Sequence, residues 1–505
     1  MTGPGQDHIV IVGGGTAGWM AAAALARFAP QRVTLVESDA IGTVGVGEAT
    51  IPQIRLFNAA LGLNEAEFLR ETRGSFKLAI EFAGWAGEGT SYLHAFGHVG
   101  QGAGLLPFQH HWARARALGL AEDLSAYALN DVAARANRMQ IWPGDAGPGA
   151  PDLPRAYHFD AGLYAACLRR HAERHGAVRI EGTVAQVIRN GETGDIAEVV
   201  LDGERRVSGD FFIDCTGFRA LLIEQTLAAG FEDWSHWLPC DRAVAIPCET
   251  RGEFTPYTRS IARTAGWQWR IPLQHRIGNG HVYCSDYLSD DEAAATLLAN
   301  LDGTPLAEPN FLRFTTGMRQ QQWVGNCLAL GLAAGFMEPL ESTSIHLVQS
   351  AIGRFLQMVP SGRTDPAMAA EFNRQAAFEW SRIRDFLILH YHANGRHGVP
   401  FWDRCRAMAV PETLAAKLAA FRATAYIHRE HEELFTEPGW LQVMIGQGVL
   451  PHGWNPLADT MPEADLAAMM DSLARRNRDL AAQMPGHVEF LRAFCLPPSP
   501  DRKTA

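Results

Sequence analysis

The chain has 505 residues, of which 47% are hydrophobic and 20% are charged. This length and composition allow a large buried core and more than one domain, and they exclude a disordered protein. The formal net charge is −11, and no basic stripe is present, so a nucleic-acid partner is not expected.

The distribution of cysteines and the hydropathy limit the class of protein further. The eight cysteines are scattered without a C-x-x-C pair, so neither a metal site nor a disulfide framework is expected. No apolar run reaches the roughly 18 residues of a membrane span. The short polar segment before residue 8 does not resemble a signal peptide. We therefore expect a soluble cytoplasmic protein without membrane contact.

The first predicted elements form a βαβ unit. Residues 8–12 predict a buried parallel strand, residues 19–28 an alanine-rich helix and residues 33–37 a second strand. The glycine-rich run of residues 13–18 lies between the first strand and the helix. This is the context in which a dinucleotide fingerprint is meaningful.

Gly13, Gly15 and Gly18 give the spacing G-x-G-x-x-G. The first glycine makes the tight turn, the second lets a pyrophosphate approach the backbone and the third lets helix and strand pack closely. Thr16 and Ala17 complete the predicted phosphate site at the helix N-terminus. Glu37, at the end of the second strand, is placed to bind an adenosine ribose. The alternative is a glycine-rich turn that binds nothing.

The strand that ends in residues 214–217 (Asp-Cys-Thr-Gly) favours FAD over NAD. An early fingerprint followed by such a strand resembles the large superfamily of FAD-containing monooxygenases. No second fingerprint follows a strand, so we expect the flavin to be reduced by a separate protein.

Later elements complete an α/β pattern with a helical end. The remaining predicted strands are residues 179–190, 197–201, 209–217, 267–272, 280–287 and 326–331. The predicted helices are residues 345–358, 368–393, 412–430 and 462–484. We expect a core of residues 1–365 with an interleaved β-rich region at about 235–325, a helical module of residues 366–496 and a frayed tail of residues 497–505.

Four segments then resemble one family. They are Trp267-Gln-Trp269-Arg-Ile271-Pro272 (W-x-W-x-I-P), residues 45–52 (Gly-Val-Gly-Glu-Ala-Thr-Ile-Pro), residues 76–85 around Lys77, and residues 338–345 around Glu341. All four are similar to segments of flavin-dependent halogenases of the tryptophan-halogenase type. The resemblance runs from residue 8 to about residue 350. Beyond that it rests on helical character and on Gly439-Trp440.

The resemblance implies a monooxygenase-type FAD domain with a mostly helical substrate module. It implies that FADH2 from a separate reductase, O2 and chloride or bromide give hypohalous acid, which travels through a tunnel to Lys77. The Lys77 side chain would hold this oxidant beside an electron-rich aromatic, an indole-like molecule, and turn it into a positioned electrophile. The alternative for Lys77 is a solvated surface lysine.

The resemblance also implies the role of Glu341. A carboxylate near the reacting carbon can stabilise the cationic ring and help remove its proton. Glu338 is the other candidate for this role. The alternative for both residues is a structural role, in which an acidic side chain stabilises a helix N-terminus.

Other site residues follow from the same resemblance. Backbone N–H groups of Thr343 and Ser344 would hold the halide, although family members often have glycine at the position of Ser344. The residues implied to contact the flavin are Ala49, Val184, Leu332 and Ile345. The residues implied to line the tunnel or the substrate pocket are His94, Phe96, Trp267, Trp269, Ser342 and Trp440. Core packing or a structural loop remains the alternative for the aromatic residues.

The chain departs from the family around residues 433–444. The paired tyrosines that clamp free tryptophan are not present there. A bare indole or a larger aromatic is therefore as plausible as tryptophan. Two other functions stay open at this point, an aromatic monooxygenase that uses no halide and a non-catalytic flavin-binding protein. A homodimer also stays open.

Overall fold

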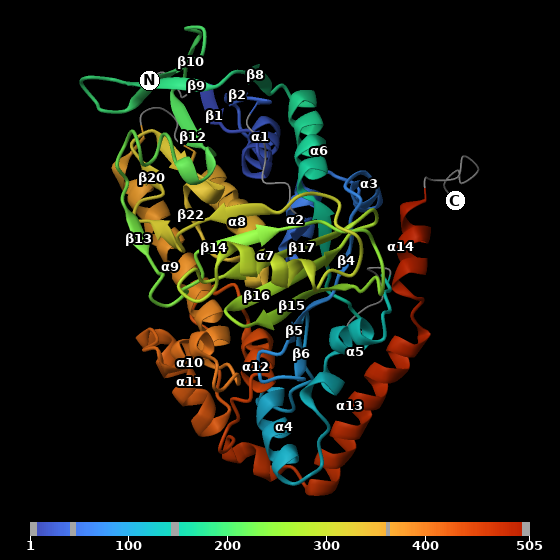
Figure 1. The fold of residues 1–505 in the computed structure, drawn as a ribbon. Coiled ribbons are helices and arrows are strands. Elements are labelled where there is room, and N and C mark those ends of the chain that lie inside the picture. Colours follow the sequence, from blue (N-terminus) through green and yellow to red (C-terminus); the bar gives the residue numbers. More distant parts are fainter. Residues whose placement is uncertain (1–7, 41–46, 143–150, 360–363, 497–505) are drawn as a thin grey trace. The chain divides into compact units, whose positions relative to one another are not determined.

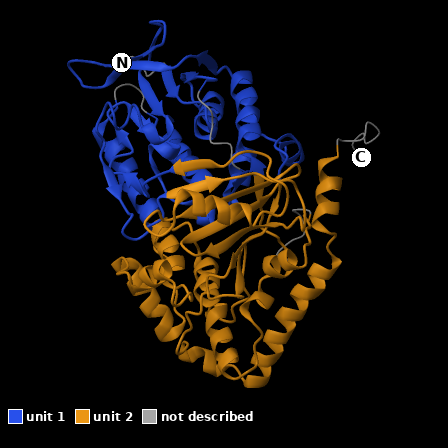
Figure 2. Ribbon diagram, in the orientation of Figure 1, with its two compact units in different colours: residues 1–74, 159–241, 313–381 blue, residues 75–158, 242–312, 382–505 orange. Residues whose placement is uncertain are grey.

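A computed structural model describes residues 8–40, 47–142, 151–359 and 364–496. The chain divides into two compact units that alternate along the sequence (Figure 2). Unit 1 consists of residues 1–74, 159–241 and 313–381, and unit 2 consists of residues 75–158, 242–312 and 382–505. Both units combine helices with sheets, so the α/β class is confirmed.

Unit 1 is built on a largely parallel sheet. Its described strands are, in spatial order, β20 (Trp323–Val324), β21 (Cys327–Ala329), β12 (Phe211–Asp214), β1 (His8–Val12), β2 (Arg32–Glu37) and β8 (Val178–Glu181). Only the pairing of β20 with β21 is antiparallel. The apolar residues of β1 are buried, as expected for a strand covered on both faces.

Helix α1 (Thr16–Phe28) packs against α6 (Ala161–Arg174) and α8 (Ser344–Met358) (Figure 1). Four consecutive buried alanines in α1 allow this close approach. The other elements of unit 1 are β3 (Gly47–Ala49), α2 (Gln53–Ala60), α3 (Glu65–Glu71), β9 (Val184–Arg189), β10 (Ile196–Leu201), β11 (Arg206–Ser208), η2 (Gly217–Arg219), β13 (Phe231–Asp233), β19 (Gly317–Arg319), η3 (Gly331–Ala333), β22 (Gly335–Phe336) and η4 (Pro339–Glu341).

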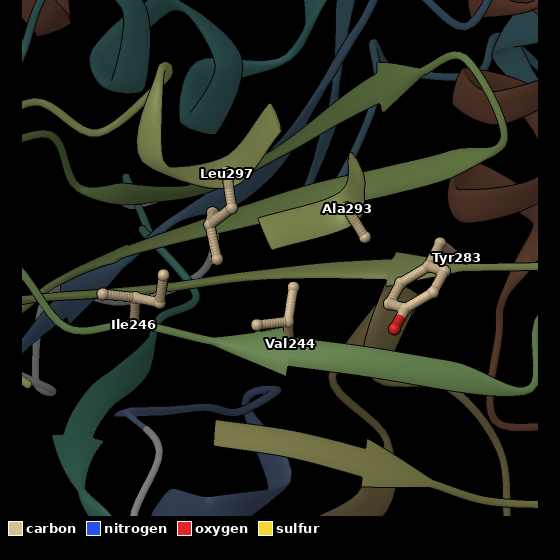
Figure 3. Packing of buried hydrophobic residues seen from close by; sticks show 5 residues of the cluster. All are labelled: Val244, Ile246, Tyr283, Ala293 and Leu297. Atoms are coloured by element: carbon tan, nitrogen blue, oxygen red, sulfur yellow. The ribbon is translucent and has the colours of Figure 1, made fainter. Parts of the chain in front are cut away.

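Unit 2 contains a mixed sheet. Its described strands are, in order, β18 (Asn310–Arg313), β14 (Arg242–Ala245), β17 (Ile277–Tyr283), β16 (Gly266–Pro272), β15 (Tyr257–Arg263), β5 (Ala79–Ala83) and β6 (Ser91–Ala95). Helix α7 (Asp290–Leu298) covers part of this sheet. Its Ala293 and Leu297 pack on Val244, Ile246 and Tyr283 (Figure 3).

The remaining elements of unit 2 are mostly helical. They are β4 (Ser75–Lys77), α4 (Phe108–Ala117), η1 (Leu124–Tyr127), α5 (Leu129–Arg135), α10 (Pro400–Ala407), α11 (Glu412–Thr424), α12 (Glu437–Gly446), η5 (Pro456–Thr460), α13 (Glu463–Gln483) and α14 (His487–Cys495). Strands β7 (Ala156–Asp160) and β18 and helix α9 (Pro366–His392) each contain a boundary between the units.

Several predicted elements differ from the structure in their bounds. The strand predicted at residues 179–190 is two strands, because the chain breaks at Gly182 with φ of 157°. The strand predicted at residues 280–287 begins earlier and ends at Tyr283. The helix predicted at residues 412–430 ends at Thr424, because Ala425 adopts a left-handed conformation. The sequence does not predict helices α2 to α7, α10, α12 and α14.

Among the residues that the structure describes, none of the helices has the length and apolar character needed to cross a bilayer. The same part of the chain contains no group of His, Cys, Asp or Glu side chains that could hold a metal ion.

Candidate functional site

The glycine-rich turn after β1 is shaped by contacts on one side and by open space on the other. Gly13 has φ of 110°, and a Cβ atom there would lie 2.2 Å from the carbonyl oxygen of Cys215. A Cβ on Gly18 would lie 1.9 Å from the oxygen of Gly13. A Cβ on Gly15 would meet nothing within 4 Å. The fold therefore explains the first and third glycines, while the second faces free space where the fingerprint places a pyrophosphate.

Helix α1 begins at this free space. Gly15 is its N-cap residue, and no side chain caps the helix there. Thr16 and Ala17 form its first turn, where backbone N–H groups and the helix dipole favour an anion. The arrangement fits the phosphate groups of a dinucleotide.

Glu37, at the end of β2, is already engaged by two protein donors. Its Oε1 accepts from Arg179 Nε at 2.5 Å, and its Oε2 accepts from Trp19 Nε1 at 3.3 Å. A carboxylate can accept about four hydrogen bonds, so capacity for ribose hydroxyls remains. Arg179 was not singled out from the sequence, because only the pairing of β8 with β2 brings it to Glu37.

The loop after β12 packs beside the fingerprint. Asp214 is fully buried, and its two oxygens accept from the backbone of Thr216, Leu222 and Ile223 and from the Thr216 hydroxyl, at 2.7 to 2.9 Å. These bonds fix the turn whose Cys215 carbonyl contacts Gly13. Asp214 therefore organises the loop from within the protein.

The predicted flavin contacts fall on several elements of unit 1. Leu332 lies in η3, which approaches α1 so closely that a Cβ on Gly331 would lie 2.8 Å from the Ala17 side chain. Ile345 lies in the first turn of α8 and Ala49 in β3, and both are buried. Val184 begins β9 and is partly exposed.

Glu48 in β3 belongs to the same family-like segment, of which Gly45 and Val46 lie outside the described residues. Its side chain keeps some exposed surface, yet burial raises the pKa of its carboxyl to about 7. An ionisable group of this kind is more frequent at functional sites than elsewhere.

The segment before α8 has an irregular backbone. Glu338 precedes the single 3-10 turn η4 and Glu341 is its last residue, and both are about 1% exposed. Ser342 follows with φ of 59° and ψ of 36°, a left-handed conformation that costs a non-glycine residue about 1 kcal/mol. Helix α8 starts at Ser344 with Thr343 as its N-cap residue, and no side chain caps it. The first N–H groups of α8 can therefore serve an anion.

Lys77 lies at the end of β4 in unit 2 and is completely buried. Its Nζ lies 5.5 Å from the centroid of the Phe96 ring, within the range of a cation–π contact. This burial rules out the solvated surface lysine that the sequence left open.

A cluster of aromatic side chains forms around His94, two residues before Phe96. His94 contacts Phe386 and Phe435, whose rings stack with centroids 3.8 Å apart, and Trp440 meets Phe386 edge to face at 4.8 Å. The indole nitrogen of Trp440 is buried without a hydrogen-bond partner among the described residues. Phe386 and Phe435 carried no signal in the sequence, because helical spacing alone does not distinguish them from core residues.

Trp440 also contacts a buried ion pair. The ammonium of Lys417 lies 4.4 Å from the Trp440 ring centroid. It donates to the carboxylate of Glu433 at 2.9 and 3.2 Å and to the carbonyl of His428 at 2.5 Å. The three donors of this ammonium are thus used inside the protein.

Trp267 and Trp269 lie on the same face of β16, as their spacing predicts. Both are buried, and their ring centroids are 6.2 Å apart. The Trp269 nitrogen has no hydrogen-bond partner among the described residues. This unpaired donor is unusual, since a buried indole N–H usually finds a partner.

The predicted residues thus fall into two sets. The cofactor residues, Glu341, Ser342, Thr343 and Ser344 belong to unit 1. Lys77, the aromatic residues around His94, and the two tryptophans of β16 belong to unit 2.

Comparisons with known proteins extend over nearly the whole chain. Residues 8–463 match the family of tryptophan halogenases. The chain is 33% identical to the tryptophan 6-halogenase SttH of Streptomyces toxytricini, over 97% of this chain and 98% of that protein. A solved flavin-dependent halogenase from Xanthomonas campestris is 48% identical with a TM-score of 0.94, covering 98% of this chain and 100% of the other. The flavin-dependent halogenase BrvH from Brevundimonas sp. BAL3 is 43% identical with a TM-score of 0.93, covering 97% and 100%.

Proposed function

Since this chain belongs to the family of tryptophan halogenases and is a flavin-dependent halogenase, we propose that it halogenates a bare indole or a related aromatic that lacks an amino-acid backbone. The match over residues 8–463, together with a buried Lys77 in the corresponding segment, supports halogenation. The surroundings of Trp440 support the choice of substrate. The comparisons do not favour a monooxygenase or a non-catalytic flavin protein.

The cofactor of this proposal is FAD. The free space beside Gly15 and the open N-terminus of α1 would hold its pyrophosphate, and Glu37 would bind its ribose. When bound in its reduced form, the flavin would give two electrons to O2, so that one oxygen atom leaves as water and the other oxidises the halide to hypohalous acid. The chain has one dinucleotide fingerprint, so a separate flavin reductase would supply the reduced form.

Chloride or bromide would bind at the N-terminus of α8. The N–H groups of Thr343 and Ser344 offer hydrogen bonds, and the dipole of this 15-residue helix adds favourable potential. The left-handed Ser342 turns the chain so that the preceding η4 segment does not continue the helix and cover these groups. The side chain of Ser344 leaves the backbone donors in place.

Lys77 would hold the hypohalous acid and direct its halogen to the ring. Its ammonium can donate a hydrogen bond to the oxidant's oxygen and polarise the oxygen–halogen bond. Positioning of this kind replaces a freely diffusing oxidant by a fixed electrophile. The buried position of Lys77 favours this role, since few solvent dipoles would compete there.

Glu341 would stabilise the cationic ring and accept its proton. A buried carboxylate has a strong field in a low dielectric, which suits a developing positive charge. Glu338 is equally buried, so burial does not separate the two residues. The proposal prefers Glu341 because of its place in the family-like segment.

The substrate proposal rests on the surroundings of Trp440. His94, Phe96 and Trp440 would provide ring contacts for an indole. A free amino acid would need partners for its ammonium and its carboxylate. Lys417, the cation beside Trp440, is already bound to Glu433 and His428, so it is not offered to a substrate carboxylate.

A reconstituted assay tests the function. Purified protein would be supplied with FAD, a flavin reductase, NADH, bromide and indole, and the products would be identified by mass. We expect monobromoindole that depends on every component. Hydroxylated indole without bromide would support a monooxygenase instead, and the absence of any product from indole and from larger aromatics would contradict the proposal.

A further inference from the structure

A completely buried histidine lies beside the strand that carries Lys77. Strands β4 and β7 pair in antiparallel fashion, with Ser75 opposite His158 and Lys77 opposite Ala156. Ser75, Lys77 and His158 are all 0% exposed. Alternate residues of a strand share one face, so Ser75 and Lys77 project to the same side of β4. A hydrogen bond between His158 and Ser75 would therefore act on the same strand that carries Lys77.

Three hydrogen bonds form one chain through His158. The Ser75 hydroxyl donates to the carbonyl oxygen of Pro272 at 2.8 Å. His158 Nδ1 lies 3.0 Å from Ser75 Oγ, and His158 Nε2 lies 2.9 Å from Thr258 Oγ1. The chain links β4, β7, β15 and the last residue of the W-x-W-x-I-P strand β16.

The direction of each bond follows from its acceptors. A carbonyl oxygen only accepts, so the Ser75 proton is used on Pro272. Ser75 Oγ must then accept from His158 Nδ1–H, which assigns the proton to Nδ1. His158 Nε2 carries the lone pair and accepts from the Thr258 hydroxyl. Every polar atom of the imidazole is satisfied in the neutral form.

The surroundings oppose a charge on this ring. Burial lowers the pKa of His158 well below 6.5, and the positive charge of Lys77 on β4 lowers it further. His487 on α14 and Arg270 on β16 act in the same direction. His487 is itself buried, with its pKa lowered by burial to about 4. Arg270 is paired with Asp302 at 2.6 Å.

We propose that His158 is a positioning residue for Lys77, which fixes β4 through Ser75 and keeps a neutral ring beside the ammonium. The proposal rests on the proposed role of Lys77. A neutral ring with both nitrogens bonded holds Ser75 in one place without adding a second cation. Loss of the Thr258 donor would leave Nε2 with an unused lone pair and let the ring turn, so Ser75 and β4 would lose a fixed partner.

Thr258→Val is the most direct variant, because it keeps the shape of the side chain and removes the hydroxyl. Ser260→Ala is its matched control: Ser260 is equally buried two residues along β15, and its hydroxyl has no partner among the described residues. The assay measures the fraction of reduced flavin consumed that ends as bromoindole, alongside the rate of flavin oxidation and the melting temperature. Lys77→Ala is measured in parallel.

We expect Thr258→Val to lower the bromoindole fraction by about fivefold at pH 7, as the loss of one hydrogen bond would. Flavin oxidation should not change. Thr258→Ser, which restores the hydroxyl, should return the fraction to the wild-type value, a rescue that side-chain volume alone would not give. A wild-type yield for Thr258→Val, or no rescue in Thr258→Ser, with Lys77→Ala inactive, would overturn this inference alone. Retained yield in Lys77→Ala would overturn the proposed role of Lys77 instead.

A second measurement observes the His158 ring itself in the wild-type protein. In wild-type protein with ¹⁵N-labelled histidine, the His158 resonances should report a neutral Nδ1–H tautomer between pH 6 and pH 8. The signals would be assigned by their loss in His158→Asn. A charged ring or an Nε2–H tautomer would overturn the inference.

Discussion

The Nζ atom of Lys77 lies 5.5 Å from the centroid of the Phe96 ring, and both side chains are buried. The contact joins the end of β4 to the end of β6, because Phe96 N donates to the carbonyl of Leu78 at 2.9 Å. The residue proposed to carry the oxidant thus lies beside a residue proposed to contact the aromatic substrate.

The two buried glutamates before α8 can be separated by matched amide variants. Glu341→Gln should lower bromoindole formation at least ~100-fold, the lower end of what a general base contributes, since the amide keeps the shape and loses the charge. Glu338→Gln should change it by less than about threefold, in the range of an ordinary buried hydrogen bond. Release of hypobromous acid should persist in both variants. Equal losses of product would contradict the choice of Glu341.

The choice between indole and tryptophan tests the proposal that the region around Trp440 does not bind an amino-acid backbone. Indole should be turned over with a kcat/KM at least ~10-fold above that of L-tryptophan, because the charged backbone of the amino acid would be desolvated without partners. The bound state of Lys417 is the structural reason. Competition between the two substrates in one reaction, followed by mass spectrometry, gives the ratio directly. A preference for tryptophan would show that a clamp exists elsewhere.

Gly15 and Gly13 should respond differently to the same substitution. Gly15→Ala places its Cβ in open space with an ordinary extended backbone, so the melting temperature of FAD-free protein should not change. FAD should bind at least ~10-fold more weakly, because the methyl group would occupy the approach to the backbone. Gly13→Ala should instead destabilise the protein, since its Cβ would overlap the Cys215 carbonyl. Unchanged FAD affinity in Gly15→Ala would move the pyrophosphate away from this turn.

Glu48 should make stability depend on pH in the FAD-free protein. Its folded pKa is raised to about 7, so the folded state binds a proton more tightly than the unfolded chain. Below about pH 4.5 the carboxyl is protonated in both states, so it does not change the free energy of unfolding. This free energy then falls as the pH rises towards 7, and above that pH the full cost of burying an ionised carboxyl remains.

Glu48→Gln removes this cost. The free energy of unfolding of the variant should rise relative to that of wild type as the pH rises from 4.5 to 7, by roughly 3 kcal/mol at most. Urea unfolding across this range measures the difference. The exposed Glu88→Gln is the control, and stability curves for Glu48→Gln that stay parallel to wild type would contradict the raised pKa.

What the sequence predicts well is local. The βαβ unit and its glycines lie within thirty residues, and their spacing encodes both the turn and the pairing of β1 with β2. The face shared by Trp267 and Trp269 likewise follows from strand geometry.

What the sequence does not predict depends on pairing between distant segments. Ser75 meets His158 across 83 residues, and Arg179 meets Glu37 across 142. The stacking of Phe386 on Phe435 is of the same kind. Because the two units alternate along the chain, no linear boundary describes them. The linear division into a core of residues 1–365 and a helical module of residues 366–496 stays a prediction.

The most direct measurement of the central claim is the fate of the oxidant in Lys77→Ala. Wild type and variant would receive reduced FAD, O2, bromide and indole, with and without a dye that is bleached by free hypobromous acid. We expect bromoindole and little bleaching for wild type, and background bromoindole with strong bleaching for the variant, at equal rates of flavin oxidation. Bromoindole at the wild-type rate from Lys77→Ala would contradict the proposed role of Lys77.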